Sequence, residues 1–571
     1  MPHLEALVEN GAMGDLYQPP PHVPALAFTT LATGKPPGRH RILANWEPDP
    51  LTAFPRAISR ASLRAKPIWE ILEDAGLRAH VCNWPATHPA PLLRGGAVSN
   101  LFAPATTALP RDWPLVANAV HPPESETALT GLRVHPADIA AADLRYFVPR
   151  LDEIDQDNDK RLIPLAGAVA ESVTAHAAAT WQLEHSQPAF LAVCYPLIGA
   201  ACRHYLRYPE TDVFGGAVAA ACQFQDRMLG TILELAGADA LIVIISAHGF
   251  LTGVAAPGPQ PAAGDFWPRA HGVLCLAGPG VAPDMLLHGP SALDVVPTIL
   301  AWLGLPAADD MPGRVLAEAL PGTLPLPRIE TWEPARETRA SDPAPAPMTG
   351  ELSKLGYTDP AAGRLRTETA RFHREESFQL ACYHLAAGHP ASAIELLEPL
   401  AKFGDPPHAA SYLAWAYLAT NRIDDAAAVE FPCTDRLSGL LRALILFRSK
   451  QTPEALGLLQ ASEANETDPV FLCLCGDVYR MSFRVLDAER CYDRALAANP
   501  ELAEAHLGLA RILLAQGRVR EAADSALRAT GLRFNLAEAH LTLAAALARL
   551  GQTEAARAAA ATAGALRRRT S

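Results

Sequence analysis

The pattern of hydrophobic positions changes near the middle of the chain. Up to about residue 320, short apolar runs alternate with stretches of helical periodicity. Three of these runs predict buried strands of a parallel sheet, namely FLAVCY (190–195), LIVIIS (241–246) and GVLCLAG (272–278). The stretch from Gly216 to Gly237 predicts a helix between them. This alternation predicts an α/β domain over residues 1–320.

Residues 321–364 show neither apolar runs typical of strands nor a helical period. The first thirty of them, 321–350, are rich in Pro and Ala. Such a composition is typical of an extended, semi-rigid spacer. We therefore expect a linker over residues 321–364.

Residues 365–571 are helical and repetitive. The segment AEAH occurs at 503–506 and again at 537–540, a spacing of 34 residues. A small residue is followed twelve positions later by Ala in six pairs: Ala381/Ala393, Ala414/Ala426, Ala443/Ala455, Gly476/Ala488, Ala510/Ala522 and Ala544/Ala556. This period, with two helices in each unit, is that of the tetratricopeptide repeat. We expect five or six units stacked into a right-handed solenoid; an irregular helical bundle is the alternative.

Composition and charge narrow the classes of function. Hydrophobic residues make up 49% of the chain and the net charge is −13, which argues against a nucleic-acid binder. The start of the chain lacks the pattern of a signal peptide, and we find no apolar run of about 18 residues that would predict a membrane span. The ten cysteines form no regular framework, as is typical of a reducing compartment. We therefore expect a cytoplasmic protein.

Five segments of the first half resemble a known family when they are taken in order. They are TTLATGKPPGRHRI (29–42), KPIWEILEDAGLRAHVCNWPATHPAP (66–91), IISAHGF (244–250), HGVLCLAGPGV (271–281) and LDVVPTILAWLGLPAADDMPGRVL (293–316). Their order and spacing resemble the alkaline phosphatase superfamily, in particular its type I phosphodiesterase and nucleotide pyrophosphatase-like branch. The resemblance implies a mostly parallel sheet flanked by helices. It also implies two metal ions that activate a Ser or Thr hydroxyl for attack on phosphorus.

Most of the groups that the resemblance implies are missing. The position of the nucleophile falls on Pro24, and a metal-binding Asp and His are replaced by Gly199 and Arg203. Ala247 replaces the Asp of the Ser-Asp-His-Gly motif. The resemblance leaves His248 and His271 as metal ligands, enough for a single zinc or manganese ion at most, so we expect no cofactor. The alternative is that both rings only pack and form local hydrogen bonds.

The resemblance also implies a first strand, ending in a metal-binding Asp, that this sequence does not contain. Residues 2–12 match the helix that follows it. Loss of this strand from the central sheet would leave unpaired backbone groups, at a cost of a few kcal/mol or more. Either another strand fills the gap or the true start lies upstream of Met1.

Several other polar residues are candidates for a site. Asp226 and Asp265 could in principle replace the missing carboxylates, although no spacing supports this. We interpret His288 and the Asp309–Asp310 pair as solvated surface.

Three functions remain open. The first is a pseudoenzyme whose repeats bind a protein or peptide on their concave face; Tyr383, Trp415, Tyr417 and Tyr479 either line that face or, for most of them, lie in the core. The second is a metal-dependent phosphodiesterase or phosphohydrolase with a rebuilt site. The third is a pocket in which Arg203 and His248 hold a phosphorylated or sulfated ligand without turnover.

Overall fold

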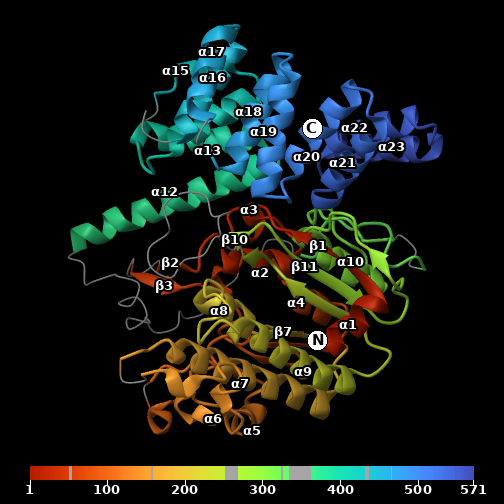
Figure 1. The fold of residues 1–571 in the computed structure, drawn as a ribbon. Helices are drawn as coiled ribbons and strands as arrows, with labels where there is room; N and C mark the ends of the chain where they lie inside the picture. Colours follow the sequence, from red (N-terminus) through yellow and green to blue (C-terminus); the bar gives the residue numbers. More distant parts are fainter. Residues whose placement is uncertain are drawn as a thin grey trace.

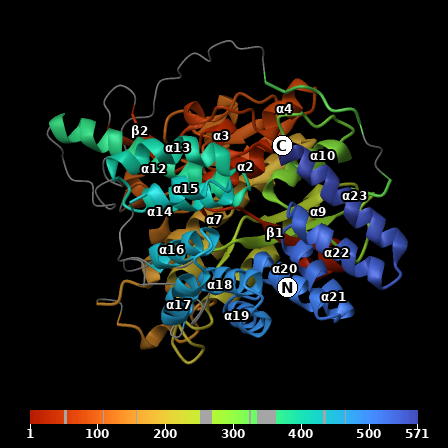
Figure 2. The same cartoon turned by 90° about the horizontal axis from the view of Figure 1, so that it is seen from above.

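The computed structural model describes residues 1–49, 54–107, 109–155, 158–250, 268–322, 326–333, 362–430, 436–463 and 466–570. An α/β domain forms the first part and a stack of helix pairs forms the second (Figure 1). The helix pairs arch over one end of the sheets, as the view from above shows (Figure 2). The two parts of the predicted organisation are therefore present and lie in contact.

Eight strands of the α/β domain form two four-stranded sheets. The first sheet has the order β12 (Met285–Leu286), β1 (Gly11–Tyr17), β11 (His271–Ala277) and β8 (Ile242–Ser246). The second has the order β6 (Val120–His121), β5 (Gly96–Val98), β4 (Ala79–Cys82) and β7 (Phe190–Val193). The α/β fold class is confirmed, but strand directions are mixed rather than mostly parallel.

Strand β11 explains much of this difference, because it is antiparallel to both β1 and β8. The chain leaves β8 through β9 (Gly249–Phe250) and returns through β10 (Pro268–Arg269), which pair antiparallel with each other. A hairpin-like return places the next strand antiparallel to the first. The prediction of a parallel strand at 272–278 was therefore wrong in direction. Strand β4, by contrast, runs parallel to both β5 and β7.

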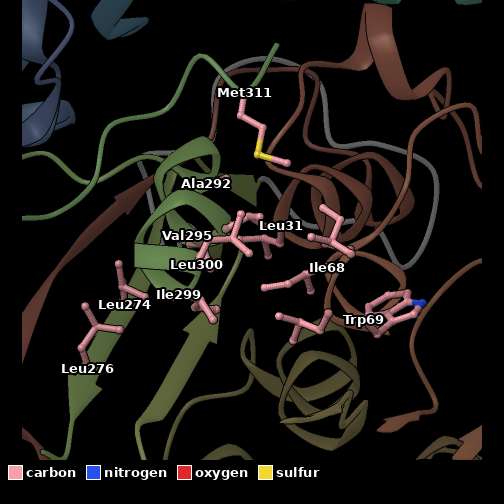
Figure 3. Close-up of a cluster of buried hydrophobic side chains, with 14 of the residues drawn as sticks. Leu31, Ile68, Trp69, Leu274, Leu276, Ala292, Val295, Ile299, Leu300 and Met311 are labelled. Atoms are coloured by element: carbon pink, nitrogen blue, oxygen red, sulfur yellow. The ribbon is translucent and has the colours of Figure 1, made fainter. Parts of the chain in front are cut away.

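Helices cover both faces of the sheets. One face packs against α2 (Pro24–Thr33), α4 (Ile68–Asp74) and α10 (Val295–Trp302). Figure 3 shows Leu31, Ile68 and Val295 from these helices converging with Leu274 and Leu276 of β11. The side chains of β7 that point to the other face pack against α7 (Leu162–Ser186) and α9 (Ala217–Ala236). Helix α9 is flanked by Gly216 and Gly237, as the sequence predicts.

By length and composition, α7 is the one helix among the described residues that could cross a membrane. However, 56% of its most apolar window is buried inside the protein. Its hydrophobicity is therefore explained by its place in the α/β domain. The domain also contains the shorter helices α1 (Pro2–Glu9), α3 (Pro37–His40), α5 (Glu126–Thr130), α6 (Ala141–Leu144) and α8 (Leu197–Tyr205), and the strand pair β2 (Trp46–Pro48) and β3 (Pro55–Ala57).

Strands β7 and β8 are each the last strand of their sheet. Among the described residues, β7 pairs only with β4 and β8 pairs only with β11. Ala192 of β7 and Ile245 of β8 nevertheless pack against the same hydrophobic core. The apolar side chains of both strands are half-buried rather than buried, contrary to the prediction. Within the part of the chain that the structure describes, each of these two strands therefore has a pairing partner on one edge only.

The α/β domain extends beyond residue 320 into the segment that the sequence assigns to the linker. Trp332 donates a hydrogen bond from Nε1 to the carbonyl oxygen of Pro306. Glu333 accepts one from the ammonium of Lys35 at 2.7 Å. Residues 326–333 are therefore packed on the domain.

In the described residues from 362 onward, twelve helices pair in chain order. They are α12 (Ala362–Ala386), α13 (Pro390–Phe403), α14 (Ala409–Ala419), α15 (Ile423–Ala428), α16 (Arg436–Arg448), α17 (Thr452–Glu463), α18 (Pro469–Met481), α19 (Val485–Ala498), α20 (Ala503–Ala515), α21 (Val519–Leu532), α22 (Ala537–Arg549) and α23 (Thr553–Thr570). The predicted small residues are buried in every pair. Tyr383, Tyr417 and Tyr479 are core residues, whereas Trp415 is half-buried.

Candidate functional site

The two candidate metal ligands, His248 and His271, lie at one end of the strands of the first sheet, which is called the edge of the sheet below. Tyr17 at the end of β1 pairs with His271 at the start of β11, and Val273 pairs with Ser246 at the end of β8. His248 lies two residues after the end of β8. The structure therefore brings the ends of three strands together at this edge, and the repeats lie over it (Figure 1).

His271 is buried and is held by the repeats. Its Nε2 atom lies 3.0 Å from the carbonyl oxygen of Leu532 at the end of α21. A carbonyl only accepts hydrogen bonds, so Nε2 carries the proton. Its Nδ1 atom lies 3.5 Å from the carboxylate of Glu501, between α19 and α20. Burial, as the largest cause, lowers the pKa of His271 below its ordinary value.

The carboxylates nearest to His271 interact with an arginine. The guanidinium of Arg269 is hydrogen-bonded and ion-paired to Glu501, and it lies 4.0 Å from the carboxylate of Asp15 on β1. A cation is thus already present between one carboxylate from the sheet and one from the repeats. Among the residues that the structure describes, no group of three or more His, Cys, Asp and Glu side chains is arranged to hold a metal ion.

His248 makes local contacts. Its Nδ1 atom lies 3.0 Å from the carbonyl oxygen of Gly249, and its ring packs edge-on against Phe250 with a centroid distance of 5.2 Å. Burial lowers the pKa of His248, and the positive charge of Arg203 lowers it further. Both candidate ligands are therefore neutral near pH 7, and each has a protein partner.

A third histidine, His22, lies near the other two and was not predicted as a ligand, because no motif in the sequence marks it. Burial lowers the pKa of His22 to about 4, and repulsion from His248 and His271 in their protonated forms adds to this effect. Its Nδ1 atom is buried and has no hydrogen-bond partner among the residues that the structure describes. Three histidines therefore lie close together at this edge, whereas the nearby carboxylates of Asp15 and Glu501 face Arg269.

Four positions that the resemblance assigned to catalytic or metal-binding groups lie on or beside α2, α8 and β8. Pro24 is the first residue of α2, and Gly199 and Arg203 lie on α8. Ala247 is buried directly after β8. None of these four side chains has a hydroxyl, carboxylate or imidazole.

The other carboxylates weighed from the sequence have structural roles or lie outside the described residues. Asp226 is buried on α9 and accepts hydrogen bonds from the backbone amides of His3, at 3.3 Å, and Leu4, at 2.9 Å. These are amides of the first turn of α1, which the helix itself leaves unsatisfied. Asp226 is therefore an anchor for α1. Asp265 lies outside the residues that the structure describes.

The interpretation of the Asp309–Asp310 pair as solvated surface was half right. His288 and the side chain of Asp309 are exposed. The carboxylate of Asp310, however, accepts hydrogen bonds from Lys35 at 2.7 Å and from Thr331 at 2.8 Å. Lys35 is only 2% exposed, so this carboxylate helps to neutralise a buried charge.

Comparison with known families agrees with this organisation. A model of the family described as type I phosphodiesterase / nucleotide pyrophosphatase matches residues 1–257. A tetratricopeptide repeat model matches residues 378–430 and 484–533. The first part of the chain is a type I phosphodiesterase domain of the alkaline phosphatase superfamily. The second part carries tetratricopeptide repeats.

Segments of the chain are similar to parts of several solved structures. A monomeric mutant of IFIT1 with Gppp-AAAA is 17% identical with a TM-score of 0.28, over 33% of this chain and 49% of that one. A crystal structure of MamA is 15% identical with a TM-score of 0.20, over 33% of this chain and 95% of that one. The chain thus spans about half of IFIT1. No curated protein matches it.

Proposed function

We propose that this phosphodiesterase domain is catalytically inactive and that the protein acts by binding another protein or a peptide through its repeats. The observation that carries the first half of this proposal is the ion pair between Arg269 and Glu501 beside His271. This ion pair joins the edge of the sheet to the repeats. The carboxylates nearest to His271 therefore face the guanidinium of Arg269.

The chemistry of two-metal hydrolysis explains why this matters. Two divalent cations a few ångströms apart require several carboxylates to offset their repulsion. Here Asp15 and Glu501 face Arg269, and His271 donates a hydrogen bond to Leu532. A metal ion would have to displace an arginine and break a contact between the two parts of the protein.

The binding half of the proposal rests on the repeats. Arrays of this kind present an extended concave surface and have no chemistry of their own. The small residues of each helix pair and the tyrosines Tyr383, Tyr417 and Tyr479 are buried in the cores of the repeats. We therefore place a protein or peptide partner, rather than a substrate, at the centre of this function.

A hydrolysis assay tests the proposal. The full chain would be incubated with zinc or manganese and with p-nitrophenyl phosphate or bis(p-nitrophenyl) phosphate. We expect no metal-dependent release of nitrophenol above that of the His248→Ala variant. Metal-dependent turnover that is lost in His248→Ala would overturn the proposal and favour a phosphodiesterase or phosphohydrolase with a rebuilt site.

A further inference from the structure

The array of repeats bends back on itself. Its six helix pairs are called units one to six here, in chain order from α12 and α13 to α22 and α23. In a linear solenoid each unit contacts only its neighbours. Arg533, in the loop between units five and six, nevertheless donates a hydrogen bond from Nη2 to the carbonyl oxygen of Ala386, at 2.5 Å. Ala386 ends α12 in unit one, so units one and five are joined across 147 residues of chain.

A single guanidinium makes this junction. Besides its bond to Ala386, Arg533 pairs through Nη1 with Glu504 at the start of α20, and its Nε atom lies 3.3 Å from Oδ1 of Asn535. The guanidinium carbon also lies 5.7 Å from the centre of the Tyr17 ring at the end of β1. The last carbonyl oxygens of a helix have no partner within the helix, and a positive charge is favourable there. Arg533 therefore connects unit one, unit five and the α/β domain.

The ion pair at this junction recurs one unit later. Glu504 and Glu538 are the second residues of α20 and α22, and each pairs with an arginine 29 positions further along the chain, Arg533 or Arg567. Glu538 also pairs with Arg511 of α20. The partners of Glu538 thus belong to units five and six, whereas the partner of Glu504 reaches back to unit one. This difference supplies matched controls for the junction.

The array is attached to the α/β domain on both sides of the junction. In unit one, Leu380 of α12 packs with Leu26 and Leu43. Between units five and six, the ring of Phe534 packs against Arg314, whose guanidinium carbon lies 4.1 Å from the ring centre. Between these two attachments the array rises away from the α/β domain at α16 and α17 (Figure 1). The array is therefore an arch with two feet, and Arg533 ties the feet together.

The junction is polar, unlike the interior of the units. Glu504 is 45% exposed, so water and salt reach its ion pair with Arg533. The units themselves are held together by buried side chains such as Tyr479 and Ala488 in unit four. Small polar contacts between parts of one chain allow relative motion, whereas large apolar ones prevent it. The junction can therefore open while each unit stays folded.

We propose that Arg533 is a latch that holds the array closed on the α/β domain, and that its release gives a protein partner access to the repeats. The second half of this inference rests on the proposed binding function. The first half concerns the conformation of the chain and is tested without a partner.

Small-angle X-ray scattering of the full chain tests the closure. Arg533→Met keeps the aliphatic stem and removes the charge, and Glu504→Gln removes the counter-ion. A folded chain of this length has a radius of gyration of about 25 Å, and we expect both variants to be larger than wild type by about 1–2 Å. Arg511→Met and Glu538→Gln are the matched controls, because they break the ion pair between units five and six, and they should leave the radius unchanged.

Alkylation of Cys382 by iodoacetamide gives a local readout. Cys382 lies four residues before Ala386, on the same face of α12. Burial raises the pKa of its thiol to about 12, which keeps alkylation slow in the closed array. Peptide mapping should show labelling about threefold faster or more in Arg533→Met and Glu504→Gln, and unchanged in the two controls. Labelling of Cys222 on α9 should be the same in every variant.

The same variants show what would overturn the latch. An equal radius of gyration and equal labelling of Cys382 in Arg533→Met and Arg511→Met would refute it. If Arg533→Met lost its helical circular dichroism, Glu504→Gln would decide the question with the same two readouts, because its half-exposed carboxylate is replaced by an amide of similar size.

A photo-crosslinker tests whether the latch controls access. The full chain would carry p-benzoylphenylalanine at Trp415, on the first helix of unit two, in the Arg533→Met and Arg511→Met backgrounds, and intact cells would be irradiated. We expect a protein adduct whose yield is at least about threefold higher with Arg533→Met. An equal yield from an opened array would refute the control of access. An opened array with no adduct in either background would support the closure and count against the proposed binding function.

Discussion

The contact between the α/β domain and the repeats can be tested by a single methyl group at Gly289. This residue has a φ of 56°, and a Cβ atom there would lie 2.6 Å from the amide nitrogen of Phe534 and 2.7 Å from the carbonyl oxygen of Thr530. Both atoms belong to the backbone of the repeats, so no flexible side chain can move aside. Gly280 is a matched control, because its φ is 78° and a Cβ atom there meets nothing within 4 Å.

The expected magnitude follows from these two environments. In both alanine variants the left-handed conformation should lower the free energy of unfolding by about 1 kcal/mol. Gly289→Ala must also shift the packed backbone of the repeats, which typically costs about 1–3 kcal/mol. We therefore expect Gly289→Ala to lower the free energy of unfolding by about 1–3 kcal/mol more than Gly280→Ala does.

Urea unfolding of the full-length variants, followed by circular dichroism, measures this difference. Hydrogen exchange at the end of α21 (Val519–Leu532) gives a local readout, because separation of the two parts would expose those amides. Equal free energies for the two variants, with unchanged exchange at α21, would refute the packing of the repeats against Gly289.

The other predictions concern a buried charge, a buried histidine and the open strands. The double variant D310N/E333Q should cost about 3 kcal/mol in urea unfolding, because it leaves the Lys35 ammonium buried without a counter-ion, whereas Lys35→Met should cost about 1 kcal/mol or less; equal costs would contradict this. Burial lowers the pKa of His40 to about 3. The contribution of His40 to the free energy of unfolding should therefore be constant above pH 6.5, where the ring is neutral in both states. Between pH 6.5 and about 3 only the unfolded chain binds the proton, so the free energy of unfolding should fall by up to about 1.4 kcal/mol per pH unit. In His40→Gln that slope should be shallower, and an unchanged slope would exclude His40 as its source. Amides on the open edges of β7 and β8 should exchange with solvent faster than those of β4, and equal protection would mean that another segment covers these edges.

The repeats were predictable because their signal is local and periodic. Each small residue and its partner twelve positions later are buried, as close crossing of the paired helices requires. Helix α9 was predictable for a similar reason, since Gly216 and Gly237 mark its two ends.

The directions and burial of the strands were less predictable. An apolar run such as 272–278 indicates a strand but not its direction, which here depends on the return through β9 and β10. The runs in β7 and β8 predicted buried strands, but burial depends on a neighbour on each edge. These strands have a partner on one edge only among the described residues.

The candidate site shows what sequence reasoning could not reach. His248 and His271 lie near the ends of β8 and β11, where the sequence predicted strand ends. The partners of His271 come from distant parts of the chain: Leu532 is 261 residues away. No local pattern connects such residues, because their proximity depends on how the repeats dock.

Metal content tests the central claim most directly. The full chain would be incubated with zinc and manganese, dialysed, and analysed for metal per chain. The account predicts near-zero metal, because Arg269 occupies the carboxylates beside His271 and the described histidines lack a third ligand. One or two tightly held ions per chain, lost in His248→Ala or His271→Ala, would contradict it and make the hydrolase the leading function.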